Sequence, residues 1–173
     1  ASDFLMALHF TGVVQEDSFA NLQIRLPIIV IGGGLTAVDT ATEALAYYPV
    51  QVEKFLKRTE HLGGLPPSLS AEEKIIAEEF LSHGQAFRRG DRSLLEGACR
   101  IVYRNSIQDS PSYRLNQEEL ELALHQGVHF LENATPHELK VDSYGHMENL
   151  VIKTVTGLKT LPCRTLLIAA GTQ

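Results

Sequence analysis

Ile28-Ile29-Val30-Ile31-Gly32-Gly33-Gly34-Leu35-Thr36-Ala37 is the stretch that decides the fold of this chain. Its first four residues are all β-branched and apolar, without the alternation of a half-buried strand, which is typical of a parallel strand covered on both faces. Three glycines follow, and from Thr36 onward the sequence favours a helix. The stretch therefore predicts a strand, a tight turn and a helix, the first unit of a parallel α/β sheet.

The glycine turn matches the G-x-G-x-x-G/A fingerprint of dinucleotide-binding folds, with Gly32, Gly34 and Ala37 at the small positions. Gly32 permits the tight turn, Gly34 lets the backbone approach a pyrophosphate, and Ala37 lets the helix pack against the strand. The free N–H groups of the first helical turn then face the phosphates. The alternative is a tight βα turn that binds no ligand. We expect the cofactor to lie along Gly32, Gly33, Gly34, Leu35, Thr36 and Ala37.

The length and composition of the chain are typical of one globular domain. The chain has 173 residues, of which 44% are hydrophobic and 21% charged, and its formal charge of -6 argues against a nucleic-acid partner. No apolar run approaches the roughly 18 to 20 residues of a membrane span, and no signal-peptide pattern opens the chain, so we expect a cytoplasmic protein. Cys99 and Cys163 lie far apart with no C-x-x-C pair, which supports neither a disulfide framework nor a dithiol centre.

Helical patterns dominate the first half of the chain. Ser2-Asp3 predicts the cap of a short helix that ends near Thr11-Gly12, and residues 13–25 form a polar linker. The fingerprint helix spans residues 36–48 and is interrupted at Pro49. Residues 50–58 fit either a strand or a second helix; we favour a helix, because Pro49 suits a first helical position and the segment carries charges in its middle.

The second strand is then expected at residues 97–105, which makes residues 49–96 a helical insertion. Within it, Ser70 and Glu73 form a capping box for a helix over residues 71–87, and a short helical turn covers residues 93–96. This choice matters for function, because the residues that follow the second strand select the cofactor.

The second half predicts further strands around one helix. Asn116 caps a helix that reaches about Gln126, and residues 109–112 read as a turn. Short strands are expected at residues 128–131, 139–141 and 150–155, with a third antiparallel segment after Thr156-Gly157 and a closing parallel strand over residues 164–171. The fold class expected is α/β: a Rossmann-like three-layer nucleotide-binding domain with a parallel sheet, an antiparallel β-meander and a helical insertion.

Several motifs together resemble one family. The chain is similar to the pyridine-nucleotide-binding domain of FAD-dependent pyridine nucleotide-disulfide oxidoreductases, closest to the glutamate synthase small-subunit type. The resemblance covers most of the chain except the insertion, and implies a single domain excised from a larger flavoenzyme, in which it is inserted within the FAD-binding domain. It is carried by residues 1–5, Ile31-Gly32-Gly33-Gly34, Gly97-Ala98, Val102-Tyr103-Arg104, Glu118-Glu119, Gly127-Val128, Phe130 and Ala169-Ala170-Gly171.

The resemblance also implies which residues bind the cofactor. The family places basic residues, often paired arginines, after the second strand to hold the 2′-phosphate of NADPH; here Tyr103, Arg104 and Asn105 stand there. Asn105 departs from the pair, so NADP(H) is favoured while NAD(H) stays possible. Leu35 stands where the family often has asparagine or aspartate. Ala170 and Gly171 resemble the closing segment beside the nicotinamide.

The reaction implied is hydride transfer from NADPH to FAD held on a missing domain of the same chain, with electrons passed to an iron–sulfur centre or a glutamate-synthase-like acceptor. No catalytic acid, base or nucleophile is expected, since cofactors carry such chemistry. The flavin fingerprint is missing, so the fragment alone should bind no FAD and be inactive. No metal site is expected, because Gly127 ends the helix between His125 and His129. The alternatives are a non-catalytic Rossmann scaffold or nucleotide sensor that docks a partner through the insertion, and a single-domain FAD or S-adenosylmethionine binder.

Overall fold

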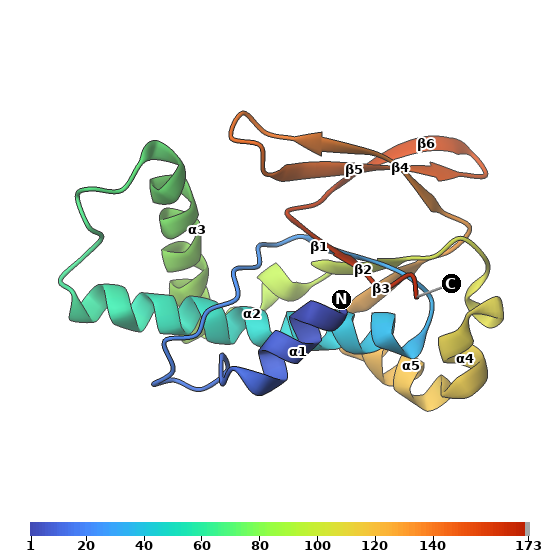
Figure 1. Cartoon of the computed structure of the whole chain (residues 1–173), viewed down its shortest axis with the longest axis horizontal. Coiled ribbons are helices and arrows are strands. Elements are labelled where there is room, and N and C mark those ends of the chain that lie inside the picture. The colour runs from blue at the N-terminus through green and yellow to red at the C-terminus, as the bar shows by residue number, and fades with distance from the viewer. Residues whose placement is uncertain (172–173) are drawn as a thin grey trace.

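A parallel sheet of four strands forms the centre of the molecule in the computed structural model, which describes residues 1–171 (Figure 1). The strands are β1 (Ile28–Ile31), β2 (Cys99–Val102), β3 (Val128–Leu131) and β7 (Thr165–Ile168), in the order β3-β2-β1-β7. Ile28 lies opposite both Cys99 and Thr165, so β1 is flanked on both sides by parallel neighbours. All four expected parallel strands are therefore present; β1 and β3 have the expected bounds, whereas β2 and β7 are shorter than the expected ranges 97–105 and 164–171.

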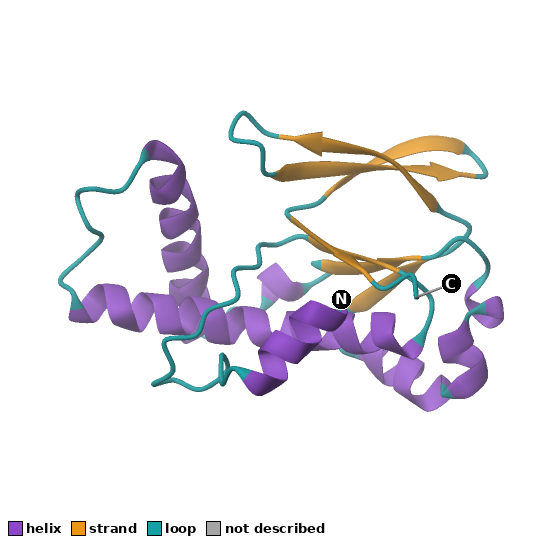
Figure 2. Cartoon of the chain, in the orientation of Figure 1, coloured by secondary structure: helices purple, strands orange, loops and turns teal. Residues whose placement is uncertain are grey.

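The sheet is covered by helices on one face and by an antiparallel sheet on the other (Figure 2). The antiparallel sheet contains β4 (Thr135–Val141), β5 (Met147–Thr154) and β6 (Gly157–Pro162), in the order β4-β5-β6. The helices are α1 (Ser2–Phe10), α2 (Leu35–His61), α4 (Pro111–Leu115) and α5 (Gln117–His125). These three layers confirm the expected α/β class with its parallel sheet and β-meander.

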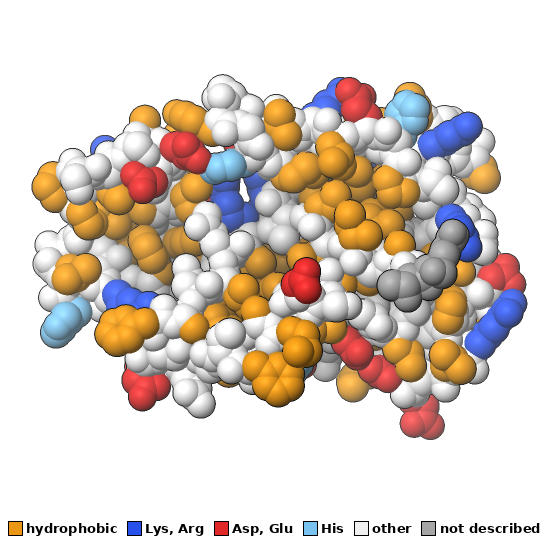
Figure 3. Space-filling view, viewed as in Figure 1, with side chains coloured by type: hydrophobic (Ala, Val, Ile, Leu, Met, Phe, Trp, Pro, Cys, Tyr) orange, Lys and Arg blue, Asp and Glu red, His pale blue; other side chains and the backbone are white. Residues whose placement is uncertain are grey.

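Two separate cores follow from the alternation of β1. Ile28 and Val30 point to the helices and pack with Ala37, Ala41 and other buried side chains. Ile29 points to the other face, where it packs with Leu150 and with four further residues of the meander and its flanks. Figure 3 shows hydrophobic side chains filling the space between the two sheets. The unbroken apolar run of β1 therefore exists because both of its faces are covered.

The fingerprint helix does not stop at Pro49, contrary to our expectation. α2 is a single helix of 27 residues that contains Pro49, although proline removes one backbone hydrogen bond and crowds the preceding turn. Tyr48, Gln51 and Val52 around it are all buried, and this packing outweighs the local preference. Residues 50–58 are helical as expected, so β2 is the second strand, but residues 49–61 are a continuation of α2.

The rest of the expected insertion forms an arm on the distal half of α2. α3 (Ala71–Arg88) begins with the expected Ser70–Glu73 capping box, and the short helix η1 (Ser93–Leu95) leads into β2. Gly84 allows α3 to approach α2 closely, because a Cβ at this position would lie 2.9 Å from the Val52 carbonyl oxygen. The arm and α2 are therefore packed backbone to backbone at this point.

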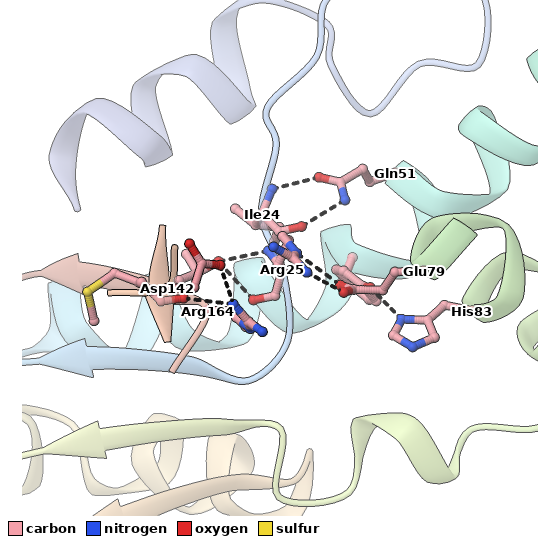
Figure 4. Close-up of polar contacts among 10 residues, drawn as sticks. Ile24, Arg25, Gln51, Glu79, His83, Asp142 and Arg164 are labelled. Carbon is pink, nitrogen blue, oxygen red and sulfur yellow. Dashed lines mark hydrogen bonds and ion pairs between the residues drawn. The ribbon is translucent and has the colours of Figure 1, made fainter. Parts of the chain in front are cut away.

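A buried polar junction ties α3, the linker and the meander together (Figure 4). Arg25 of the linker donates two hydrogen bonds to the Glu79 carboxylate of α3, the shorter at 2.5 Å. Gln51 of α2 exchanges two hydrogen bonds with the backbone of Ile24, at 2.8 and 2.9 Å. On the meander side, Arg164 donates to Asp142 at 3.0 Å. The linker is joined in turn to β7, where the Thr165 hydroxyl donates to the Arg25 carbonyl at 2.8 Å, and His146 beside the meander lies 2.7 Å from Glu72 of α3, so the arm is fixed relative to the sheets.

The helix ends agree with the sequence in part. Asn116 caps α5 as expected, but Ser2 and Asp3 lie inside α1, which begins after Ala1 and has no side-chain cap. α4 occupies part of the stretch read as a turn, with Ser110 as its cap and Pro111 at its start, and it follows the short helix η2 (Ile107–Asp109). Within residues 1–171, no helix combines the length and apolarity needed to cross a membrane.

Candidate functional site

A cleft of about 840 Å³ opens at the carboxyl ends of the parallel strands. From β1 the chain proceeds to β2 on one side, and later returns to place β7 on the other side. This reversal of strand order is the position where open α/β sheets bind ligands. The lining residues are Ala1, Ser2, Asp3, Ile31, Gly32, Gly33, Gly34, Thr36, Val102, Tyr103, Arg104, Pro111, Ala134, Thr135, Pro136, Ile168, Ala169, Ala170 and Gly171.

The glycines of the turn have different structural roles. Gly32 adopts φ +155°, and a Cβ there would lie 2.4 Å from the Ala169 carbonyl oxygen and 3.1 Å from the Ala37 Cβ. Gly34 is the N-cap of α2, and a Cβ there would meet nothing within 4 Å. Gly32 is therefore required by the packing of β1, β7 and α2, whereas Gly34 leaves open space on the side of the cleft.

The start of α2 presents unpaired backbone donors to this space. The first hydrogen bonds of the helix run from the N–H groups of Ala37 and Val38 to the Gly34 carbonyl. Within the described part of the chain, the N–H groups of Gly34, Leu35 and Thr36 have no hydrogen-bond acceptor, and no side chain caps the helix. Unpaired amides at a helix N-terminus, supported by the helix dipole, form a site for an anion such as a diphosphate.

A buried serine from α4 fixes the glycine turn. Ser112 donates to the Gly33 carbonyl from its backbone N–H at 3.0 Å and from its hydroxyl at 2.9 Å. Ser110 lies 3.1 Å from the Ser112 hydroxyl, and both serines are fully buried. The sequence predicts only a turn for this segment; the signal for a helix is Ser110 followed by Pro111, which are typical of an N-cap and a first helical residue.

Replacing Ser112 with alanine is expected to weaken both the fold and the site. The S112A variant loses a buried hydroxyl that holds the turn, which costs about 1 to 2 kcal/mol of unfolding free energy. A looser turn should weaken nucleotide binding by about threefold to tenfold. Urea unfolding and calorimetric titration with NADPH measure the two effects. S82A removes an exposed serine from α3 and is the control; an equal loss in both variants would contradict this role of Ser112.

The residues after β2 are divided between the cleft and the surface. Tyr103 lines the cleft, and its ring lies so close to Gly33 that a Cβ there would come within 2.4 Å of it. Arg104 also lines the cleft, is exposed, and forms no ion pair or hydrogen bond with any described residue. Asn105 does not line the cleft; its carbonyl accepts the Asn133 N–H at 3.1 Å. The free guanidinium of Arg104 is therefore the one expected basic group at this end of the cleft.

Of the other residues that the sequence predicts at the site, some line the cleft and some lie outside it. Ala170 and Gly171 line the cleft beyond β7, whose path is fixed by the 2.7 Å hydrogen bond from the Ala169 N–H to the Ile31 carbonyl. Leu35 and Ala37 are outside the lining, and Ala37 is buried beneath Gly32. The lining also includes three residues outside the predicted set, Ala134, Thr135 and Pro136. Their position after the end of β3 was the available signal, because the carboxyl ends of parallel strands meet at one edge.

One carboxylate near the turn has an unusual protonation equilibrium. Partial burial, followed by the neighbouring carboxylates of Glu119 and Glu43, raises the pKa of Asp39 from 3.8 to about 6. Between these two pH values, the folded state therefore binds a proton that the unfolded state has lost. It follows that the contribution of Asp39 to the free energy of unfolding increases as pH falls from about 7 to about 4.

The D39N variant is accordingly expected to be more stable than the parent at pH 7.5, by about 1 kcal/mol once the partial exposure of the side chain is considered. The gain should shrink toward zero near pH 4, because the parent then carries a neutral carboxyl at the same place. Urea unfolding at both pH values measures this, with D17N on the exposed linker as the charge-matched control. A gain that does not depend on pH would contradict the explanation.

Other reactive groups are not presented at the site. Burial raises the pKa of the Cys99 thiol to about 12 and that of Cys163 to about 11, so both remain protonated and unreactive at neutral pH. Both are free cysteines. Among the described residues, no group of histidine, cysteine and acidic side chains is arranged to hold a metal ion. The chemical capacity of the cleft therefore lies in its amides, Arg104 and its small residues.

The parallel sheet, the glycine turn of its central strand and the cleft above that turn define a Rossmann-like α/β domain. No protein-family model matches the chain. The chain is similar to an uncharacterised protein of Rickettsia prowazekii, with 42% identity over 165 residues that cover 91% of this chain and 23% of the relative. It thus spans about a quarter of the length of that relative.

The solved structures to which the chain is similar are much more distant in sequence. Thioredoxin reductase from Streptococcus pyogenes has a TM-score of 0.46 and 15% identity, over 85% of this chain and 31% of that one. A ferredoxin reductase from Rhodopseudomonas palustris has a TM-score of 0.44 and 13% identity, over 83% and 23%. Bacillithiol disulfide reductase from Bacillus cereus has a TM-score of 0.43 and 15% identity, over 86% and 29%.

Proposed function

We propose that this chain is the NADPH-binding domain of a flavin-dependent oxidoreductase. The observation that carries the proposal is the set of unpaired N–H groups at Gly34, Leu35 and Thr36 at the start of α2, of which Gly34 and Thr36 line a cleft at the switch point of the sheet. A diphosphate fits these donors, because the position of a Gly34 Cβ is open while the turn itself is fixed by Gly32 and Ser112. The amides would hold the diphosphate without any charged side chain.

Arg104 supports NADPH as the nucleotide. A guanidinium with no partner among the described residues, placed after the second strand, matches the 2′-phosphate of NADPH in charge and geometry. An NAD-binding site would instead place an acidic side chain there for the ribose hydroxyls. Tyr103 would contribute an aromatic face at the same end of the cleft, and Asn105 lies outside it, so Arg104 alone would carry the selectivity for NADPH over NADH.

The small residues at the β7 end of the cleft support the proposed transfer of hydride from NADPH to a flavin. Ala170 and Gly171 offer no large side chain there, which would let a nicotinamide ring meet a flavin on another domain. NADPH would supply the hydride, and the protein would bind, orient and shield it. We further propose the glutamate synthase small-subunit type, with FAD on another domain of the same chain and an iron–sulfur or glutamate-synthase-like acceptor. The length of the Rickettsia relative leaves room for such a domain.

Nucleotide-dependent thermal stability tests the proposal. At a concentration of about 100 times its dissociation constant, NADPH should add about 2.7 kcal/mol to the free energy of unfolding, or about 5 to 10 °C in Tm. NADH and ADP should give smaller shifts, and FAD none. Stabilisation by FAD alone would favour a flavin-binding domain instead, and no response to any nucleotide would favour a scaffold that docks a partner.

A further inference from the structure

A second hollow, which we call the linker groove, lies at the opposite end of α2 from the glycine turn. It has a volume of about 390 Å³ and is lined by Glu16, Phe19, Lys54, Lys57, Arg58, His61 and Leu62. α2 spans 27 residues, so its two ends are about 40 Å apart at the usual rise of an α-helix. The linker groove is therefore separate from the nucleotide cleft, and its use does not depend on the proposed function.

A buried lysine lies at the base of this groove. Lys54 is 7% exposed, and its ammonium donates to the Val13 carbonyl at 2.7 Å and more weakly to the Ala20 carbonyl at 3.5 Å. Burial, together with the nearby charge of Arg58, lowers the pKa of Lys54. An additional anion in the groove would offset both effects, because it would neutralise a crowded positive charge.

Basic groups also dominate the rim. Lys57 is paired with the only acid of the lining, Glu16, and lies 4.0 Å from Glu53 of the same helix. The Arg58 guanidinium donates to the Ser18 carbonyl and lies 5.6 Å from the centre of the Phe19 ring. His61 also lines the groove. The chain as a whole carries a formal charge of -6, so this small excess of positive charge stands on an otherwise acidic protein.

Two large apolar side chains lie beside these charges. Phe19 is 94% exposed and Leu62 is 71% exposed, although both belong to residue types that folding normally buries. Aromatic side chains and arginine are the residue types that protein interfaces concentrate in their centres, and here Phe19 lies beside Arg58. A simple anion would contact the basic groups and leave Phe19 and Leu62 in water.

We propose that the linker groove docks a peptide segment of a partner protein in which an acidic side chain stands next to an aromatic or aliphatic one. The carboxylate would contact Lys57 and Arg58, and the apolar side chain would cover Phe19 and Leu62. Charge complementarity favours an acidic segment, because the lining of the groove carries three basic residues against one acid on a chain whose formal charge is -6.

Three pools of fluorescein-labelled hexapeptides test this with the 173-residue chain. The first pool has central Asp or Glu flanked by Phe, Leu or Tyr; the second keeps the acids but has Ser or Gly flanks; the third keeps the apolar flanks but has Lys or Arg centres. Fluorescence anisotropy should show the first pool binding about tenfold more tightly than the others, and more weakly when salt is raised from about 50 to about 300 mM. Equal binding of the first two pools would mean an anion site only, and no preference for the first pool would also overturn the proposal.

Variants locate the binding. F19S and the double variant K57E/R58E should each weaken binding of the first pool by about tenfold. K140E/K159E makes the same charge change on exposed lysines of the meander and should leave binding unchanged. Thermal melts confirm folding of each variant; F19S, at an almost fully exposed position, serves as the decisive variant if the double change destabilises the chain. Retained binding in a folded F19S would overturn the docking site.

Discussion

Gly32→Ala is expected to lower the free energy of unfolding by about 3 kcal/mol or more, a large part of the total stability of a typical domain. The added Cβ would lie 2.4 Å from the Ala169 carbonyl oxygen, and that oxygen belongs to backbone that cannot rotate away. The positive φ of this residue adds strain for any side chain. For a chain of this size the loss corresponds to about 6 to 12 °C in Tm, which thermal unfolding measures directly.

Gly34→Ala provides the matched control for this prediction. Its Cβ would enter open space, so stability should change by no more than about 1 kcal/mol, the cost of placing alanine at an N-cap. NADPH binding should nevertheless weaken by about tenfold or more, because the methyl group stands where a diphosphate would approach the amides. Equal stability of the two variants would contradict the packing role assigned to Gly32. Unchanged NADPH affinity in G34A would contradict the use of this turn as the phosphate site.

Arg104→Ala is expected to weaken NADPH binding by about 10-fold to 100-fold, which corresponds to the loss of a charge-assisted hydrogen bond of about 1.5 to 3 kcal/mol. NADH affinity should change by less than about twofold, because NADH carries no 2′-phosphate for the guanidinium to contact. R104K should be intermediate, since an ammonium keeps the charge but loses the planar fork. Isothermal titration of each variant with both nucleotides gives the ratio of affinities.

Arg114 supplies the control for this second prediction. It is an exposed arginine of α4 that pairs with Asp109 at 3.2 Å and is not part of the cleft lining. R114A therefore removes the same charge at a neighbouring position, and surface pairs of this kind contribute little to stability. If R104A and R114A weaken NADPH binding equally, the effect is one of general charge and not of a phosphate contact.

The central strand and its turn could be predicted because several local preferences coincide there. An unbroken β-branched run, three glycines and a small-residue helix agree with one another, and the structure places Ile28–Ile31 at the centre of the parallel sheet. Pro49 was misread for the opposite reason. Its local preference favours a break, while the burial of Tyr48 and Val52 favours a continuous helix, and burial of this kind is decided by residues distant in the sequence.

The candidate site also contains some residues that could be predicted from the sequence and others that could not. The glycines and Arg104 were predicted because each has a local signature beside a strand. The role of Ser112 was not predicted, because it depends on a hydrogen bond to Gly33, which is 79 residues away in the sequence. Asn105 is adjacent to Arg104 in sequence and yet lies outside the cleft, since its carbonyl is bonded to Asn133. Tyr103 and Arg104 are also adjacent and both line the cleft, so the path of the bend after β2 decides which side chains face it, and sequence alone did not establish that path.

The exposed edge strand β4 bears on the tendency of this protein to aggregate. All seven of its residues are exposed at the edge of the meander, including Leu139 and Val141. A free, partly apolar strand edge ordinarily invites other chains to add to it and grow into fibrils. Here Pro136, the charges of Glu138 and Lys140, and two irregularities in the pairing with β5 interrupt the edge. We therefore expect the protein to remain monodisperse at high concentration. Substitutions that remove the proline and the two charges from β4 should promote its aggregation through this edge.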